Sequence, residues 1–293
     1  MPFATVLQDN KKKAVLLTIL AGFMWGTSFP AIKVGLKYID PYSFVLLRFL
    51  FAALIMLAIS LLRREFNLKF EKKRLIFSLG ITNGVAYLMQ YIGMVYVSAS
   101  ASSLFVNLSV VWVAIITPLL FHERLGWKKA LSVIISFLGV ILITTNLDFA
   151  TLTEGMIAAD LLVIVAGIMW AVWIVYNKPL VNDNSSMVQV VTWLLIFTVL
   201  PLLPIAPFSA TVLSSLPLEV WLAILYTAIF CWIVPYYLWL KGLKHISPIT
   251  SSVVLLTEII VAVTIATIAL GEIFTVISGV GAVLIIIAII LVS

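Results

Sequence analysis

The feature that most constrains this chain is a succession of apolar runs, each about twenty residues long, that follow one another along the whole sequence. Hydrophobic residues make up 63% of the 293 residues and charged residues only 10%, with a mean hydropathy of +1.22. This leaves too little polar side chain to cover a water-facing surface. The sequence therefore predicts an all-α integral membrane protein, because a helix satisfies its own backbone hydrogen bonds inside the bilayer.

Clusters of charged and turn residues divide the chain into predicted spans that can each cross about 30 Å of hydrocarbon. The ten spans cover residues 14–35, 41–62, 74–96, 99–121, 127–145, 156–177, 187–207, 218–240, 247–270 and 273–292. With the exceptions of Lys33, Lys37 and Arg48, the Lys and Arg residues fall at the ends that share one side of the membrane. Since basic residues stay cytoplasmic, we expect both termini in the cytoplasm and the chain in the plasma membrane.

The two halves of the sequence are related. The stretch GFMWGTSFPAIK at Gly22–Lys33 returns as GIMWAVWIVYNK at Gly167–Lys178, an offset of 145 residues. Later matches, such as Gly93 with Gly242, have an offset of 149. Because five spans is an odd number, the second copy enters the membrane from the opposite side. We expect two inverted five-helix repeats, over residues 1–146 and 147–293.

Several short motifs recur in a fixed order. They are MWGTSFPAIK at 24–33, FVLLRF at 44–49, SASASS at 98–103, FHERLG at 121–126, LTEIIVA at 256–262 and LGE at 270–272. In this order the sequence resembles the EamA family of the drug/metabolite transporter superfamily over nearly the whole chain. The resemblance implies ten helices, with spans 1 to 4 and 6 to 9 around a central cavity. The sequence departs from the family pattern at Ile259 and Ser109, where relatives commonly carry proline.

Glu258 lies near the middle of the predicted span 247–270. An ionised carboxylate at the bilayer centre costs about 2.5–3.5 kcal/mol on insertion scales, so we expect the side chain to face a cavity or to be protonated. Two interpretations follow. Glu258 is a proton carrier or the counter-charge for a substrate amine, or it is a protonated carboxyl group that hydrogen-bonds between helices.

Arg48 lies seven residues after Pro41, about 10 Å into the membrane by helical rise. A guanidinium group is well shaped to receive a substrate carboxylate, so Arg48 is a candidate for binding or coupling. The structural alternative is a side chain that extends to the interface or pairs with Asp40. We favour the structural alternative.

Helical spacing predicts a face lined with polar and aromatic side chains. Asn83, Tyr87 and Gln90 share one stripe, and the offset of 149 pairs them with Trp232, Tyr236 and Trp239. The candidate substrate-binding residues are Trp25, Ser28, Asn83, Tyr87, Gln90, Asn107, Trp170, Trp173, Trp232, Tyr236 and Trp239. An apolar cavity with a few hydrogen-bonding groups suits a small amphiphilic molecule. The alternative is that these aromatic residues only pack helices together.

Four other features of the sequence give less information about function. Pro235 interrupts the aromatic stripe and is either a hinge or a static kink. The stretch His122–Gly126 begins like a zinc-binding HExxH motif but ends in glycine. Cys231 is the only cysteine, which excludes a disulfide framework. The sequon at Asn184 lies on the predicted cytoplasmic side, where it would stay unmodified.

These patterns predict a secondary transporter that exports amino acids or related metabolites by alternating access, with Glu258 as the first choice for proton coupling. We expect a small-molecule substrate and the lipid bilayer as partners, and a monomer or weak homodimer. We expect no nucleic acid, cofactor or metal, and no enzymatic activity. One alternative is a passive channel or lipid scramblase, which needs a continuous polar path or a groove open to lipid. The other is an intramembrane enzyme, which needs a second titratable group facing Glu258.

Overall fold

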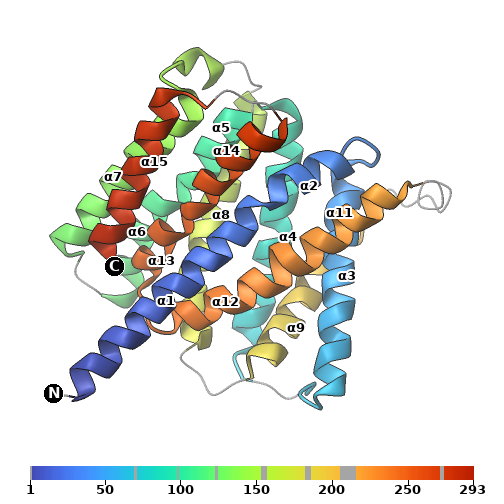
Figure 1. Ribbon diagram of the computed structural model, residues 1–293. Helices are drawn as coiled ribbons and strands as arrows, with labels where there is room; N and C mark the ends of the chain where they lie inside the picture. Colours follow the sequence, from blue (N-terminus) through green and yellow to red (C-terminus); the bar gives the residue numbers. More distant parts are fainter. Residues whose placement is uncertain are drawn as a thin grey trace.

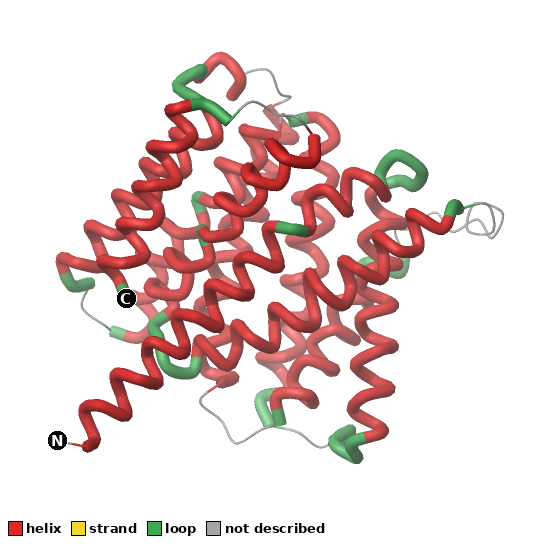
Figure 2. Tube along the Cα trace, viewed as in Figure 1, coloured by secondary structure: helices red, strands yellow, loops and turns green. Residues whose placement is uncertain are grey.

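The computed structural model describes residues 2–68, 71–97, 99–122, 125–152, 157–181, 186–204, 216–270 and 274–293. Within these residues every regular element is a helix, and the helices form one tilted bundle (Figures 1 and 2). The first half contains α1 (Pro2–Gly26), α2 (Ser28–Gly35), α3 (Pro41–Leu62), α4 (Lys73–Tyr96), α5 (Ala99–Asn107), α6 (Ser109–Phe121) and α7 (Trp127–Thr145).

The second half follows the short 3₁₀ helix η1 (Phe149–Leu152). It contains α8 (Ile157–Val181), α9 (Met187–Val199), α11 (Leu218–Ala228), the π-helical segment η2 (Ile229–Ile233), α12 (Val234–Leu243), α13 (Pro248–Leu255), α14 (Thr257–Leu270) and α15 (Val276–Val292).

The structure confirms the predicted all-helical membrane fold. Seven helices of the described chain are long and apolar enough to cross a membrane, and Met187–Val199 and Val276–Val292 are shorter apolar helices. The remaining predicted span, 14–35, corresponds to the second part of α1, which begins at Pro2, and to α2. Four spans are interrupted, at Thr27, at Leu108, at η2 and at Leu256. The interruption at η2 lies directly before Pro235, whereas those at Leu108 and Leu256 were not predicted.

Local signals explain where several helices begin. The Asp40 side chain accepts a hydrogen bond of 3.0 Å from the Ser43 amide, and Pro41 occupies the first turn of α3. The Ser247 hydroxyl accepts one of 3.2 Å from the Thr250 amide, again with a proline, Pro248, directly after the cap. These caps satisfy backbone donors that a helix start leaves free.

Helix crossings at glycines repeat between the two halves. A Cβ atom on Gly93 would lie 3.0 Å from the Ala159 carbonyl oxygen, and one on Gly242 would lie 2.8 Å from the Ala14 carbonyl oxygen. The two contacts correspond, because the offset of 149 residues relates Gly93 to Gly242 and the offset of 145 relates Ala14 to Ala159. Spans 3 and 6 therefore cross as spans 8 and 1 do, which is the relation that two inverted repeats produce.

The crossing of α7 and α15 relates the halves to each other directly. A Cβ atom on Gly139 would lie 2.6 Å from the Gly281 carbonyl oxygen, and one on Gly281 would lie 2.6 Å from the Gly139 carbonyl oxygen. Only residues without a side chain permit this reciprocal approach.

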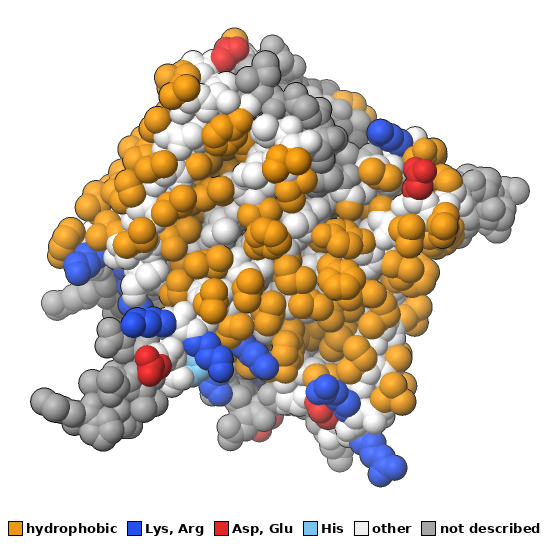
Figure 3. Space-filling view, in the orientation of Figure 1, with side chains coloured by type: hydrophobic (Ala, Val, Ile, Leu, Met, Phe, Trp, Pro, Cys, Tyr) orange, Lys and Arg blue, Asp and Glu red, His pale blue; other side chains and the backbone are white. Residues whose placement is uncertain are grey.

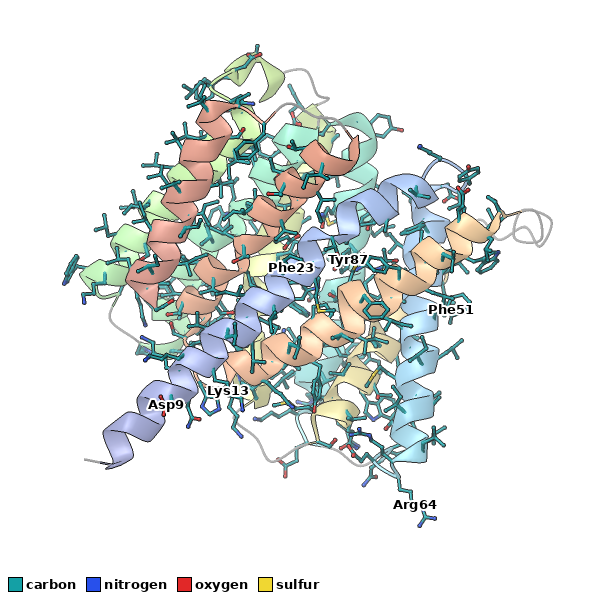
Figure 4. The ribbon with its side chains drawn as sticks, in the orientation of Figure 1. Asp9, Lys13, Phe23, Phe51, Arg64 and Tyr87 are labelled. Carbon is teal, nitrogen blue, oxygen red and sulfur yellow. The ribbon has the colours of Figure 1, made fainter. Side chains whose placement is uncertain are left out.

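The visible surface has the charge distribution of a membrane protein. In Figure 3 hydrophobic side chains form a broad band, and Lys and Arg concentrate along the lower edge. Lys13 and Arg64 lie at this edge in Figure 4, and both termini lie toward the lower left of Figure 1.

Candidate functional site

Three of the interruptions meet inside the bundle. At the break between α1 and α2, a Cβ atom on Gly26 would lie 2.6 Å from the Glu258 carbonyl oxygen, next to the break between α13 and α14. The Thr27 hydroxyl lies 2.7 Å from the Tyr226 hydroxyl and 3.7 Å from the Cys231 sulfur in η2. Spans 1, 8 and 9 therefore contact one another where their helices are irregular.

Pro235 determines what the irregular part of span 8 exposes. In an α-helix the carbonyl of Cys231 would accept from the amide of residue 235, but proline has no amide hydrogen. The segment before it is π-helical, and the Val234 amide donates to the Ile229 carbonyl instead. Pro235 thus frees the carbonyl of Cys231.

The Arg48 side chain donates a hydrogen bond to this carbonyl. Its Nη2 donates to the Cys231 carbonyl oxygen at 3.0 Å, and its Nη1 donates to the Tyr91 hydroxyl at 3.3 Å. Its guanidinium carbon lies 5.1 Å from the centre of the Tyr87 ring and 5.4 Å from that of Phe49, within cation–π range.

The structural alternative for Arg48, a side chain that extends to the interface or pairs with Asp40, was therefore wrong about where the side chain lies. The side chain is only 2% exposed, so it does not extend to the interface. Its described acceptors are Tyr91 and Cys231, whereas Asp40 caps α3. The guanidinium is held by the carbonyl of Cys231 on span 8. The sequence of span 2 alone does not reveal this partner.

Glu258 lies in the first turn of α14, directly after the break at Leu256. Its side chain stays partly accessible, unlike that of Arg48. Glu258 lies within electrostatic range of Arg48, Tyr87 and Cys231. Two ionisable side chains from different halves of the chain, Arg48 and Glu258, thus lie near one another at the meeting point of the breaks.

Beside this pair is a densely packed aromatic group. The rings of Trp173 and Trp239 stack at 5.0 Å with an interplanar angle of 10°, and Tyr236 lies 5.1 Å from Trp173. Trp232 joins the group at 4.7 Å from Tyr236. All four side chains are at most 3% exposed. They pack spans 6 and 8 together.

Two polar atoms of this buried group have partners that the sequence did not indicate, whereas Trp173 Nε1 is buried without one. The Tyr236 hydroxyl donates to Asn177 Oδ1 at 2.6 Å, and Trp239 Nε1 donates to the Ser251 hydroxyl at 2.6 Å. Asn177 follows Trp173 by one helical turn, so a polar residue in an apolar run was the available signal. Ser251 belongs to a run of hydroxyl residues that begins at Ser247, the cap of α13.

A second, partly accessible group lies between these rings and Arg48. The Tyr87 ring is 4.7 Å from that of Trp170, whose Nε1 donates to Gln90 Oε1 at 3.1 Å. Figure 4 shows Tyr87 among the side chains behind α1 and α2. Trp25 approaches from α1, with its ring 6.2 Å from that of Trp239.

The structure places three predicted site residues differently. Asn83 is fully buried and donates to the Thr198 hydroxyl on α9 at 3.1 Å, so it packs against span 7. Asn107 donates to the Ser103 carbonyl of its own helix at 2.8 Å. Ser28 is buried at the first position of α2, beside Thr27.

Nothing in the described residues forms a metal centre, since they contain no group of three or more His, Cys, Asp or Glu side chains that could hold an ion. The glutamate and arginine of the HERLG motif, at 123–124, and the sequon asparagine, at 184, lie outside the described residues. The same is true of Ser98.

The fold and the site together define a polytopic helical membrane protein with a charged and aromatic interior. The chain belongs to the EamA-like transporter family, whose model matches residues 12–145 and again residues 157–293. It is therefore a membrane transporter. This confirms the resemblance that the sequence motifs indicated.

Relatives agree with this membership. A protein of Archaeoglobus fulgidus named "Uncharacterized transporter" is 29% identical over 80% of this chain and 81% of its own length. The Bacillus subtilis "Uncharacterized transporter YyaM" is 26% identical over 94% of this chain and 92% of its own length. One solved crystal structure matches with a TM-score of 0.78 at 16% identity and covers 96% of each chain, a likeness that shows the fold alone.

Proposed function

We propose that this protein is a secondary transporter that exports amino acids or related small metabolites across the plasma membrane by alternating access. Residues 1–146 and 147–293 form the two repeats, which rock against each other, and both termini are cytoplasmic. The meeting of three interrupted spans around Arg48 and Glu258 carries the proposal, because broken helices and buried charges mark transport sites within membranes.

The partly accessible side chains bind the substrate in this proposal. Tyr87, Gln90, Trp170 and Glu258 combine aromatic surface with hydrogen-bonding groups and one negative charge. Such a lining fits a molecule that is apolar at one end and polar at the other. The buried stack around Trp173 supports these side chains from behind.

Glu258 couples transport to protons in this proposal. A carboxyl group at this depth that can be reached from one side alternates between a neutral and an ionised form as the halves move. In this proposal, movement of the halves changes the distance between Glu258 and the Arg48 guanidinium, and with it the strength of their electrostatic attraction.

Transport assays in proteoliposomes test the coupling. Wild-type protein should move radiolabelled amino acids faster when a pH gradient is imposed, and Glu258→Gln should lose that stimulation. The matched control is Glu219→Gln, an exposed acid in the first turn of α11, which should keep it. Undiminished gradient dependence in Glu258→Gln would exclude Glu258 as the coupling residue.

Counterflow separates a carrier from a channel or scramblase. Unlabelled substrate inside the vesicle should accelerate entry of the labelled substrate, because a carrier returns faster when it is loaded. A protein that conducts its substrate without any such acceleration is a channel, and alternating access would then be wrong.

A further inference from the structure

Arg48 is a buried cation with neutral acceptors. The two groups that accept its described hydrogen bonds, the Tyr91 hydroxyl and the Cys231 carbonyl, carry no formal charge. Moving a guanidinium group out of water is costly, and neutral acceptors compensate less than a carboxylate does. Glu258 lies nearby but accepts none of the described hydrogen bonds of Arg48. The guanidinium can therefore exchange a neutral acceptor for the carboxylate of a bound molecule.

On one edge of the guanidinium, only one of the two nitrogens has a hydrogen-bond acceptor. Nε and Nη2 form a planar edge that matches the two oxygens of a carboxylate. Nη2 holds the Cys231 carbonyl, whereas Nε is buried without an acceptor in the structure. A carboxylate on this edge would satisfy Nε and take the place of the carbonyl at Nη2.

We propose that the transported molecule carries a carboxylate, which binds the Nε–Nη2 edge of Arg48 and displaces the carbonyl of Cys231. This inference rests on the proposed transport function and names its substrate class. The rest of the molecule lies against the Tyr87 and Trp170 rings, and an amino group, when present, faces Glu258.

The displacement has a structural consequence. Because Pro235 has no amide hydrogen, the released carbonyl of Cys231 lacks the i+4 donor that an α-helix would supply. Leaving a buried carbonyl unpaired costs about 1–3 kcal/mol, so the π-helical segment rearranges to find a new partner. The Arg48–Cys231 bond joins α3 of the first half to η2 of the second half, so its loss removes one connection between the halves at the irregular segment.

Cys231 supplies a built-in reporter of this rearrangement. It is the only cysteine of the chain, and its side chain is 0% exposed. Its thiol lies 3.7 Å from the Thr27 hydroxyl, so opening of η2 away from span 1 exposes it. Its reaction rate with N-ethylmaleimide therefore reports the state of the segment.

The experiment measures Cys231 labelling in proteoliposomes with 3-phenylpropionate, L-phenylalanine or the methyl ester of 3-phenylpropionate. We expect each carboxylate to accelerate labelling at least about threefold, because access controls the thiol's reaction. The ester should have no effect. Equal acceleration by acid and ester, or none by either acid, would overturn the proposal.

Variants identify the residues responsible. Arg48→Gln should label rapidly without ligand and should not respond to carboxylates. Pro235→Ala restores the amide that the Cys231 carbonyl lacks, so it should still be stabilised by carboxylates in thermal unfolding while its labelling no longer responds. The control Lys37→Gln, at an exposed position, should respond like wild type. A full labelling response in Pro235→Ala contradicts the exchange.

Counterflow on the same vesicles separates this inference from the proposed function. Carriage of compounds that lack a carboxylate, or carriage of carboxylates with unchanged labelling, would overturn the exchange at Arg48 and leave the transporter proposal standing. Absence of carrier behaviour with accelerated labelling would overturn the transporter proposal instead.

Discussion

At the scale of single residues, the interior depends on how one buried cation is held. Arg48 and Tyr91 come from adjacent spans of the first half, whereas the Cys231 carbonyl comes from the second. The guanidinium therefore stabilises contacts inside one half and between the halves. Residue substitutions can separate these two roles.

Replacing Tyr91 by phenylalanine removes one acceptor from the buried guanidinium. We expect a loss of about 1–3 kcal/mol of stability, since a buried donor is left unpaired. Thermal unfolding in nanodiscs, followed by tryptophan fluorescence, should show a lower melting temperature. Tyr96→Phe is the matched control, because Tyr96 lies on the same helix and is 61% exposed. Equal melting temperatures for the two variants would contradict the bond's contribution.

His245 in the turn after α12 gives a prediction on pH. Partial burial, together with the charges of Lys244, Lys178 and Lys13, lowers the pKa of His245. Because the folded pKa lies below the unfolded one, a stability penalty is absent above about pH 6.5 and grows as the pH falls through that value.

NMR titration of ¹⁵N-histidine-labelled protein tests the cause of this shift. Lys244→Gln removes a neighbouring positive charge, so the pKa of His245 should rise toward its ordinary value. Lys37→Gln, at an exposed position on a different connection, should leave the titration unchanged. A titration in Lys244→Gln that matches wild type would show that Lys244 does not lower the pKa.

At the scale of elements, close helix crossings depend on individual glycines. Gly279 and Gly281 lie two residues apart on α15 and make a matched pair. A Cβ atom on Gly281 would lie 2.6 Å from the Gly139 carbonyl oxygen, whereas one on Gly279 would meet nothing closer than 3.5 Å. The two positions differ in their surroundings although they share a helix.

Alanine at position 281 should force α7 and α15 apart. We expect Gly281→Ala to cost about 1–3 kcal/mol, as overpacking typically does, and to lower the melting temperature. Gly279→Ala should leave stability unchanged or raise it slightly, because alanine is the better helix former. Similar melting temperatures for both variants would show that the crossing tolerates a side chain.

The approximate positions of the spans could be predicted from the apolar runs and the charged and turn residues between them. Two of the four interruptions within the spans could not. Pro30 marks the break at Thr27, since it lacks the amide that would bond the Gly26 carbonyl, but no proline or glycine marks the breaks at Leu108 and Leu256. Pro235 did mark an irregularity, which the structure shows as a π-helical segment before it. Tertiary contacts supply the partners that make such breaks tolerable.

The shared stripe of span 3 shows a second limit. Asn83 and Gln90 are seven residues apart, and on a straight helix such positions differ by about 20° around the axis. Because α4 packs against both α8 and α9, Gln90 bonds to Trp170 on α8 whereas Asn83 bonds to Thr198 on α9. Periodicity predicts a face, and only packing decides which neighbour each residue meets.

At the scale of the whole molecule, we expect the basic edge seen in Figure 3 to lie on the cytoplasmic side of the membrane. Fusions to alkaline phosphatase, which is active only outside the cytoplasm, test it. We expect an inactive enzyme when it is fused after Ser293 and an active one when it is fused after Asp148. Activity at Ser293 would place the termini on different faces or the whole chain upside down.

The reciprocal crossing of α7 and α15 also restricts how the gene can change. At Gly139 and Gly281, the backbone of each position fills the space that a side chain at the other would need. Neither codon can mutate to a larger residue first without separating the helices. The contact thus holds both positions to glycine although they lie in different halves of the chain.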